Sequence, residues 1–202
     1  MKVVFDIDGT LSNPGHRLHF IQPKGEDCSV CDSWGGNLPG ARVHDRDHTR
    51  SGSCTYAKKD WDGFFAACGD DTPIPINVKL CQELMLAGHT LEFWTGRREA
   101  ERDTTVEWLN KHVVGREIYL NLLAHHDEWD QYLSQVIYLS LTEASGSLKM
   151  RKDGDRRPDY IIKMEFIDWD HPPDIIFEDR SRVVRTYRER GLTVFQVAEG
   201  DF

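Results

Sequence analysis

The sequence predicts an α/β fold in which helices cover both faces of a parallel sheet. Short apolar runs rich in β-branched and aromatic residues alternate along the chain with stretches whose apolar residues recur at helical spacing. This alternation is typical of parallel sheets, because each crossover between strands places a helix on one face. The chain has 202 residues, which fits one domain with room for insertions.

Five segments are predicted as strands: 2–7, 91–95, 149–155 (a strand followed by a loop), 175–177 and 193–197. The first is a buried run that ends in the turn Asp8-Gly9-Thr10. We expect Gly96 to end the second strand and Glu178-Asp179 to end the fourth. These ends matter because ligands of open α/β sheets bind there.

Five segments have the apolar spacing of helices: 61–68, about 77–87, 98–112, 160–169 and 181–190. Gly88 and Gly191 are good C-terminal stops for the second and fifth of these helices. The fourth is expected to place Trp169 on its apolar face before Pro172-Pro173 breaks it. Cys68 and Cys81 lie on apolar helical faces and are predicted to belong to the core.

Two regions interrupt the alternation and are predicted as insertions into a single domain spanning 1–202. Residues 21–57 are rich in Gly, Ser, Asp, Arg, Cys and His and have no clear periodicity. Residues 119–146 mix aromatic and aliphatic residues with acids, and either a helical segment or an added hairpin fits them.

Charge and hydropathy exclude several classes of protein. The formal net charge of −9 argues against broad, charge-driven adhesion to nucleic acid or to an anionic membrane. No apolar run approaches the ~18 residues of a membrane span. Met1 leads directly into the first strand, which is too short for a signal peptide. We therefore expect a cytoplasmic protein with reduced cysteines that does not bind membranes.

Chemically active residues gather where the predicted strands end. Carboxylates, a hydroxyl group and cations stand at strand ends or on the helix before the fourth strand: Asp6, Asp8, Thr95, Arg97, Lys163, Glu178 and Asp179. Neighbouring carboxylates repel one another, and a divalent cation offsets that repulsion. Mg²⁺ suits a site that offers a few carboxylates together with phosphate and water.

These residues resemble the four motifs of the haloacid-dehalogenase-like (HAD) phosphotransferase superfamily, whose fold is a HAD-like Rossmannoid sheet with cap-type insertions. The matches are Asp6-Ile7-Asp8-Gly9-Thr10, then Thr95, Lys163 and the pair Glu178-Asp179. The resemblance implies that Asp6 attacks phosphorus to form an aspartyl-phosphate, while Asp8 acts as general acid and then general base. It also implies that Thr95 holds phosphoryl oxygens and that Lys163 balances the charge of Asp6 and the phosphate.

The resemblance further implies that Mg²⁺ is held by Asp6, the carbonyl group of Asp8, and Asp179. Glu178 stands where the superfamily more often has Asp, and its longer side chain is expected to reach the metal only through water.

A narrower resemblance is to the 3′-phosphatase domain of phage polynucleotide kinase-phosphatase. It covers residues 1–20, 74–112 and 147–202, including the segments 177–184 and 195–202 and the Arg-rich loop 151–159. It implies Mg²⁺-dependent removal of 3′-phosphates from DNA or RNA ends, as in phage-like nucleic-acid repair. By the same resemblance, substrate phosphates and backbone are bound by Arg17, Gly96, Arg97, Arg151 and Arg180, with Asp159 orienting one arginine.

Two alternatives stay open: a HAD phosphatase for a free nucleotide or other small phosphomonoester, and a non-catalytic end-binding module of a repair assembly. The sequence contains no Gly-x-x-x-x-Gly-Lys-Ser/Thr loop, so a separate kinase or ligase is the expected partner for end repair.

The first insertion holds candidate zinc ligands: Cys28, Cys31, His44, His48 and Cys54. Cys-x-x-Cys is a common zinc half-site, and a structural Zn²⁺ could order this segment. The alternative is a loop with incidental cysteines. In the second insertion, aromatic residues could stack on bases or form a small core.

Overall fold

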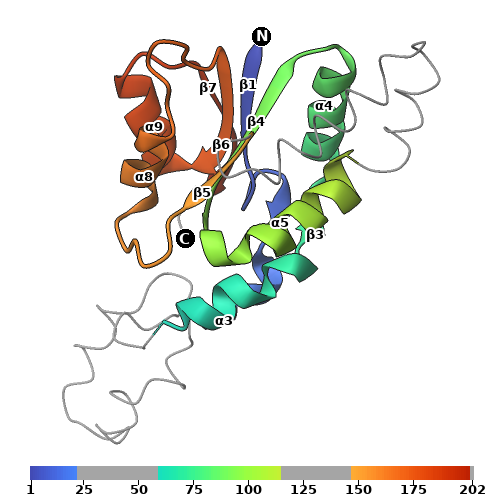
Figure 1. Ribbon diagram of the computed structural model, residues 1–202, viewed down its shortest axis with the longest axis vertical. Helices are drawn as coiled ribbons and strands as arrows, with labels where there is room; N and C mark the ends of the chain where they lie inside the picture. Colours follow the sequence, from blue (N-terminus) through green and yellow to red (C-terminus); the bar gives the residue numbers. More distant parts are fainter. Residues whose placement is uncertain (22–58, 115–146, 201–202) are drawn as a thin grey trace, which may run out of the picture. The chain divides into compact units, whose positions relative to one another are not determined.

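The computed structural model describes residues 1–21, 59–114 and 147–200 (Figure 1). Most of both predicted insertions, including every candidate zinc ligand, lies outside these residues, and the zinc site stays a prediction. Two compact units are present, and each is described by itself: Met1–Asn13 with Gly69–Phe202, and Pro14–Cys68.

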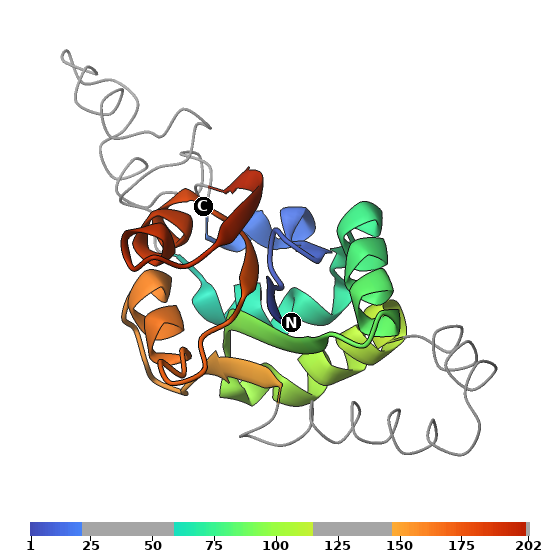
Figure 2. The ribbon, with the colours of Figure 1, turned by 90° about the horizontal axis from the view of Figure 1, so that it is seen from above.

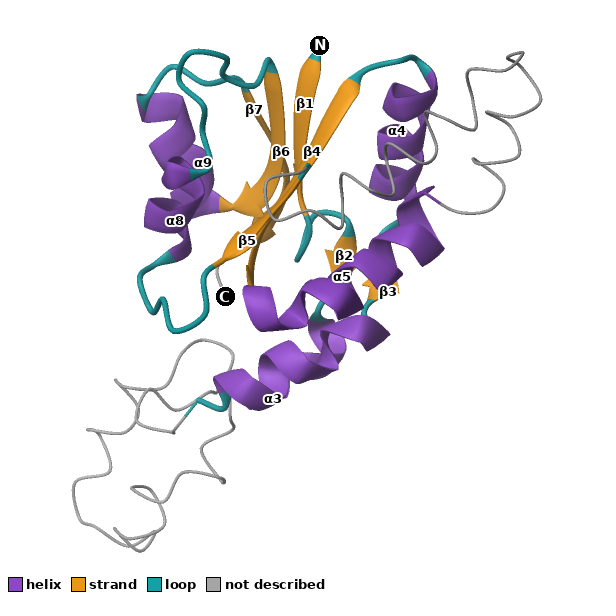
Figure 3. Ribbon diagram, in the orientation of Figure 1, coloured by secondary structure: helices purple, strands orange, loops and turns teal. Residues whose placement is uncertain are grey.

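The larger unit is built on a five-stranded parallel sheet in the order β5–β4–β1–β6–β7 (Figure 3). Its strands are β1 (Lys2–Asp6), β4 (Thr90–Arg98), β5 (Leu148–Arg151), β6 (Ile175–Arg180) and β7 (Val194–Gly200). The central strand β1 pairs with β4 on one side and with β6 on the other. This topology confirms the predicted α/β fold with a Rossmann-like parallel sheet.

Helices cover both faces of the sheet (Figures 1 and 2). One face carries α4 (Pro75–Leu86) and α5 (Arg102–Leu109), which continues into η5 (Asn110–Val114), and the other carries α8 (Asp159–Glu165) and α9 (Ser181–Glu189). Successive residues of β1 point to opposite faces of the sheet. Val3 and Phe5 pack in the core under α4 and α5, and Val4 packs in the core under α8 and α9. The predicted sheet covered on both faces is therefore confirmed.

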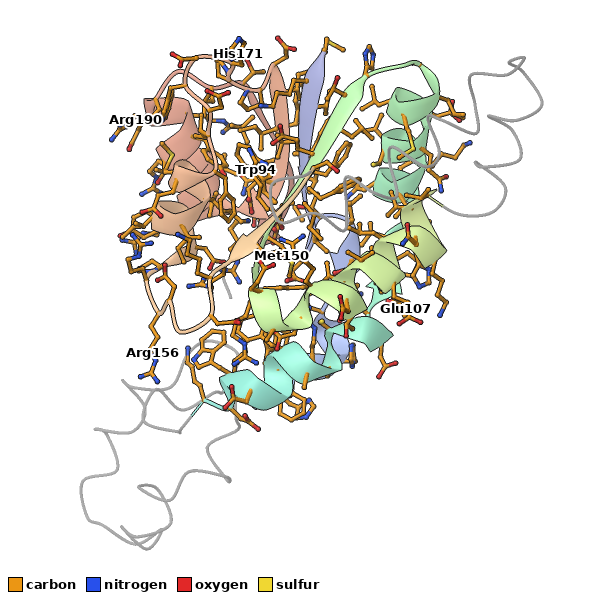
Figure 4. All side chains as sticks on the ribbon, viewed as in Figure 1. Trp94, Glu107, Met150, Arg156, His171 and Arg190 are labelled. Atoms are coloured by element: carbon orange, nitrogen blue, oxygen red, sulfur yellow. The ribbon has the colours of Figure 1, made fainter. Side chains whose placement is uncertain are left out.

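Side chains in the middle of the larger unit are buried, and charged residues lie around it. In Figure 4, Trp94 and Met150 lie within the sheet region, whereas Glu107, His171 and Arg190 lie toward the outside. Among the described helices, none is long and apolar enough to cross a bilayer.

Several element boundaries differ from the sequence prediction. β4 continues through Gly96 to Arg98, because a shift in its register with β5 absorbs the irregularity. The helix after it starts at Arg102, following the 3₁₀ turn η4 (Glu99–Glu101). α8 ends at Glu165, so Trp169 is half exposed instead of lying on an apolar helical face. α4 begins at Pro75, since proline suits the first turn of a helix.

A short antiparallel pair was not predicted. β2 (Ser12–Asn13) pairs with β3 (Thr72–Pro73), and the N–H of Ile74 donates to the carbonyl oxygen of Leu11 at 2.8 Å. Two-residue strands are too short to produce an alternating pattern. The pairing ties the chain after β1 to the segment before α4.

The smaller unit contains the 3₁₀ helix η1 (Gly15–Phe20) and the helix α3 (Trp61–Ala66). Only α3 lies within a segment predicted to be helical, residues 61–68. The side chain of Asp60 caps α3 by accepting from the N–H of Gly63 at 2.8 Å. Phe64 and Phe65 form its apolar core with Ile21. Both cysteines predicted to belong to the core, Cys68 in this unit and Cys81 in the larger one, are fully buried.

Candidate active site

Three buried carboxylates meet at the carboxyl ends of the two central strands. Asp6 ends β1, and Glu178 and Asp179 lie in β6 next to it. One carboxylate oxygen of each lies within 4.8 Å of the others. The register pairs Phe5 with Phe177, so the residues that follow come to the same height in the sheet. The sequence expectation that these groups converge is met by the geometry.

Lys163 reaches these carboxylates from α8. Its Nζ lies 2.6 Å from Oδ1 of Asp6 and 2.6 Å from Oε2 of Glu178. Burial alone would lower the pKa of Lys163, but the charges of Asp6 and Glu178 raise it well above its ordinary value, so the ammonium stays charged. Burial, with the charge of Glu178, raises the pKa of Asp6 well above its ordinary value in spite of Lys163. We call Asp6, Lys163, Glu178 and Asp179 the acidic cluster.

Asp179 is the member of the acidic cluster whose charge is least compensated. Burial and the neighbouring Glu178 raise the pKa of Asp179 to about 7. Its Oδ1 is buried and has no hydrogen-bond partner among the described residues. Gly9, at φ +91°, and Gly200 lie directly against the same carboxylate, because a Cβ atom on either residue would overlap with Oδ2 of Asp179. The backbone at Gly9 and Gly200 therefore lies so close to the Asp179 side chain that no larger residue fits there without a shift.

This donor set fits a hard divalent cation. Three carboxylates face one ammonium group, and Oδ1 of Asp179 is buried with no hydrogen-bond partner among the described residues. Such oxygen ligands suit Mg²⁺. Asp6 and Asp179 are the better placed to hold it, because Glu178 already binds Lys163 through Oε2 and accepts the N–H of Arg180 at Oε1, at 3.1 Å.

A second ionic group surrounds Asp8, and we call Asp8, Ser12, Asp71 and Arg97 the Asp8 cluster. Nη2 of Arg97 lies 2.7 Å from Oδ1 of Asp8 and 2.8 Å from Oδ2 of Asp71. The hydroxyl of Ser12 lies 2.9 Å from Oδ2 of Asp71 and 3.2 Å from Oδ1 of Asp8. Thr95 Oγ1 lies 3.5 Å from Oδ2 of Asp8 and accepts the N–H of Arg97 at 3.1 Å.

A third group joins two arginines through one acid, and we call Arg151, Asp159 and Arg180 the arginine cluster. Asp159, at the start of α8, accepts hydrogen bonds from Arg151 through one carboxylate oxygen and from Arg180 through the other. Nε of Arg151 also donates to the carbonyl oxygen of Gly96 at 2.9 Å. A Cβ atom on Gly96 would lie 2.7 Å from Oδ2 of Asp159, so β4 runs tightly against this group.

Arg17 belongs to the smaller unit. Its side chain is fully buried, with the guanidinium carbon 4.2 Å from the centre of the Phe64 ring and Nη1 donating to the Phe64 carbonyl oxygen at 3.2 Å. A cation over an aromatic face is a stable arrangement. The predicted contact between Arg17 and substrate stays a prediction.

Apart from Arg17, and from the candidate zinc ligands that lie outside the described residues, the site residues predicted from the sequence lie in the three clusters or directly beside them. Sequence reasoning missed Asp71 and Ser12. Neither stands at the end of a strand of the main sheet, and the β2–β3 pairing that brings them together left no sequence pattern.

A protein-family model and several solved structures resemble this chain. The model of the polynucleotide kinase PNKP phosphatase domain family matches residues 124–202, a range that holds Lys163, Glu178 and Asp179. It does not include Asp6 or Thr95, which the fold brings to the same site. A search of curated protein sequences finds no match.

Two solved structures are similar over 100% of the chain at 21% identity. They are titled the Pnkp1/Rnl/Hen1 complex (TM-score 0.52, 47% of that chain covered) and the Pnkp1/Rnl/Hen1 RNA repair complex (TM-score 0.53, 43% covered). The chain therefore spans less than half the length of these relatives. A haloacid dehalogenase-like family hydrolase from Streptococcus pneumoniae aligns with 96% of the chain and 83% of its own length, at 13% identity and a TM-score of 0.46.

Proposed function

We propose that this chain, a HAD-type phosphatase fold similar to the PNKP phosphatase domain, is a Mg²⁺-dependent phosphatase that removes 3′-phosphates from nucleic-acid ends. The observation that carries the phosphatase chemistry is the acidic cluster. Asp6, buried at the end of β1, is bound by Lys163 and lies beside carboxylates with an unpaired oxygen. That arrangement presents a nucleophile together with a place for a cation that offsets phosphate charge.

The reaction takes two steps. In the first, a carboxylate oxygen of Asp6 attacks phosphorus, the bond to the 3′ oxygen breaks, and that oxygen takes the proton of the Asp8 carboxyl group. In the second, water gives its proton to Asp8 and its hydroxyl to phosphorus, which releases phosphate and restores Asp6. Thr95 and the backbone N–H that follows it, that of Gly96, hold phosphoryl oxygens, and Lys163 balances the charge of Asp6 and the phosphate. When bound by Asp6, the carbonyl group of Asp8, and Asp179, Mg²⁺ would supply positive charge against the phosphoryl oxygens.

The arginine cluster supports a substrate with more than one phosphate. Its formal charges are two guanidinium groups against one carboxylate, and it adjoins the acidic cluster through Arg180, which follows Glu178 and Asp179 in β6. Arg151 and Arg180 would bind the terminal phosphate or the next internucleotide phosphate, with Asp159 orienting both. Arg17 and Arg97 are the other phosphate contacts predicted from the sequence.

The relatives point to the biological setting. One similar structure is titled an RNA repair complex, and the matched family is named for a polynucleotide kinase. We propose that this phosphatase acts on DNA or RNA ends beside a kinase or ligase carried on another chain or domain.

The test is phosphate release from matched oligonucleotides, DNA and RNA, that carry either a 3′- or a 5′-phosphate, in Mg²⁺ and in EDTA. We expect Mg²⁺-dependent release from 3′ ends. Release that is no faster from the oligonucleotide than from a mononucleotide would favour a small-molecule phosphatase. Asp6→Asn is the matched control: equal release from wild type and Asp6→Asn would rule out this site, and no release from either would favour an end-binding module.

A further inference from the structure

Asp71 is a buried carboxylate that lies outside every motif of the proposed reaction. Its side chain is completely buried, and so is that of Arg97, the residue to which it is ion-paired at 2.8 Å. Burying two charges costs free energy, and that cost is offset only where the geometry is good and further hydrogen bonds are made. The buried pair of Asp71 and Arg97 lies beside Asp8, the proposed general acid.

The local fold places Asp71 beside Asp8. Asp71 precedes β3, and β3 pairs with β2, so that Ser12 faces Pro73 across the pair. The indole N–H of Trp108 in α5 donates to the carbonyl oxygen of Asp71 at 2.7 Å and fixes its backbone. Asp71 is therefore held by contacts with Ser12 in β2, Arg97 in β4 and Trp108 in α5.

Arg97 connects Asp71 to Asp8. Nη2 of Arg97 is shared between the two carboxylates, at 2.7 Å and 2.8 Å, and Nε adds a bond to Asp8 Oδ1 at 3.0 Å. Because a guanidinium group is planar and rigid, the positions of its two carboxylate partners are coupled. The hydroxyl of Ser12 lies within hydrogen-bond distance of both carboxylates and closes the ring of contacts.

We infer that Asp71 is a positioning residue: through Arg97 it fixes the carboxyl group of Asp8 for proton transfer to the leaving oxygen. The inference rests on the proposed function and deepens it. Without the charge of Asp71, Arg97 has Asp8 as the remaining carboxylate of this cluster to bind, and the guanidinium group draws Asp8 out of the position for donating a proton.

The leaving group distinguishes this role from a merely structural one. A 3′ alkoxide is a poor leaving group and needs a proton in the transition state, whereas 4-nitrophenolate leaves readily without one. The ratio kcat/KM reports the steps up to the first irreversible one, which includes formation of the aspartyl-phosphate, so it isolates the step in which Asp8 donates.

The experiment compares wild type and Asp71→Asn on a 3′-phosphorylated oligonucleotide and on 4-nitrophenyl phosphate. We expect kcat/KM to fall about thirtyfold on the oligonucleotide and less than about threefold on the aryl phosphate, a part of the roughly 10²–10⁴ that general acid catalysis contributes. Asp8→Asn should show the same pattern more strongly. Ser12→Ala, a milder change in the same ring of contacts, should show it more weakly and serves if Asp71→Asn does not fold.

The control is Glu101→Gln, which neutralises another buried carboxylate, one paired with Arg98 and without a bond to Asp8. Glu101→Gln should leave kcat/KM unchanged on both the oligonucleotide and 4-nitrophenyl phosphate. Equal losses on both substrates, or no loss, in a folded Asp71→Asn or Ser12→Ala protein would overturn the inference alone. If wild type shows no Asp6-dependent release from either substrate, the proposed function fails, and the inference fails with it.

Discussion

The acidic cluster and the arginine cluster adjoin each other at the carboxyl ends of the sheet, yet their charges are balanced in opposite ways. The acidic cluster sets three carboxylates against one ammonium group, and the arginine cluster sets one carboxylate against two guanidinium groups. Under the proposed function, each would be completed by an ion of the opposite sign: a divalent cation in the first and a phosphate in the second. A phosphate monoester bound with Mg²⁺ would bring both ions at once.

The comparison shows why the net charge of −9 is a poor guide to the substrate. Charges within a few ångströms in a buried site outweigh those spread over the surface, because water and salt screen the surface charges. Under the proposed function, an acidic protein would thus bind a phosphate through the buried Arg151 and the partly exposed Arg180. Substitutions in each cluster can test this division of charge separately.

Lys163→Met should have the largest effect, because it leaves the acidic cluster without its own cation. We expect the free energy of unfolding in EDTA to fall by about 3–5 kcal/mol, as when one partner of a buried pair is removed. Urea denaturation measures it. The control is Lys149→Met, which removes a more exposed lysine paired with Glu92 and should cost about 1 kcal/mol or less. Similar losses in both variants would show that the acidic cluster needs no internal cation.

The pH dependence of stability should reveal Asp179. Its pKa is raised from 3.8 to about 7 in the folded protein, so the neutral form is favoured on folding. Its contribution to stability is complete below pH 4 and is lost as the pH rises through about 7. In EDTA, the free energy of unfolding of Asp179→Asn relative to that of wild type should therefore rise by at most about 3 kcal/mol between pH 5 and pH 8. Mg²⁺ should shrink this gap, and a constant difference across that range would contradict the assignment.

Asp159→Asn should act on substrate binding instead. With the carboxylate gone, Arg151 and Arg180 lose their shared partner, and the loss of charged hydrogen bonds predicts a fall of about 10–100-fold in kcat/KM, mostly through KM. Steady-state kinetics on a 3′-phosphorylated oligonucleotide measure it. Asp155→Asn is the matched control, since Asp155 binds the exposed Arg157. A fall in kcat alone would place Asp159 with the acidic cluster.

Two glycines provide the mildest and most direct contrast. Gly200→Ala puts a methyl group against Asp179, and Gly96→Ala puts one against Asp159. We expect Gly200→Ala to raise the Mg²⁺ concentration for half-maximal activity about tenfold with KM unchanged. Gly96→Ala should raise KM by up to about tenfold with the Mg²⁺ requirement unchanged. If the two effects were exchanged, the division into a cation site and an anion site would be wrong.

The sequence predicted the parts of the site that follow from strand ends. The apolar runs predicted β1 and β6. Because parallel strands end at one edge of the sheet, the sequence also predicted that Asp6 lies near Glu178 and Asp179. Lys163 followed from the family resemblance. These residues are specified by regular structure, which leaves a periodic record in the sequence.

The parts that escaped prediction depend on irregular structure. Asp71 reaches Asp8 through two strands of two residues each, and Gly96 lies inside β4 because a register shift lets the strand continue. α8 ends at Glu165, although the apolar spacing runs on to Trp169. Contacts of this kind depend on side-chain direction and packing, which a single sequence does not record.

The pairing of β1 with β6 also bears on how the chain folds. Phe5 and Phe177 stack with ring centres 4.5 Å apart although 172 positions separate them, and Asp6 meets Asp179 only when that stack has formed. Closing so long a loop is slow and entropically costly, and it belongs to the late assembly of a non-local sheet. Asp6 is synthesised before β6 and lacks Glu178 and Asp179 as neighbours until β6 has emerged and docked. If Asp6 and Asp179 hold a divalent cation as proposed, its binding would report completed folding as well as support the chemistry.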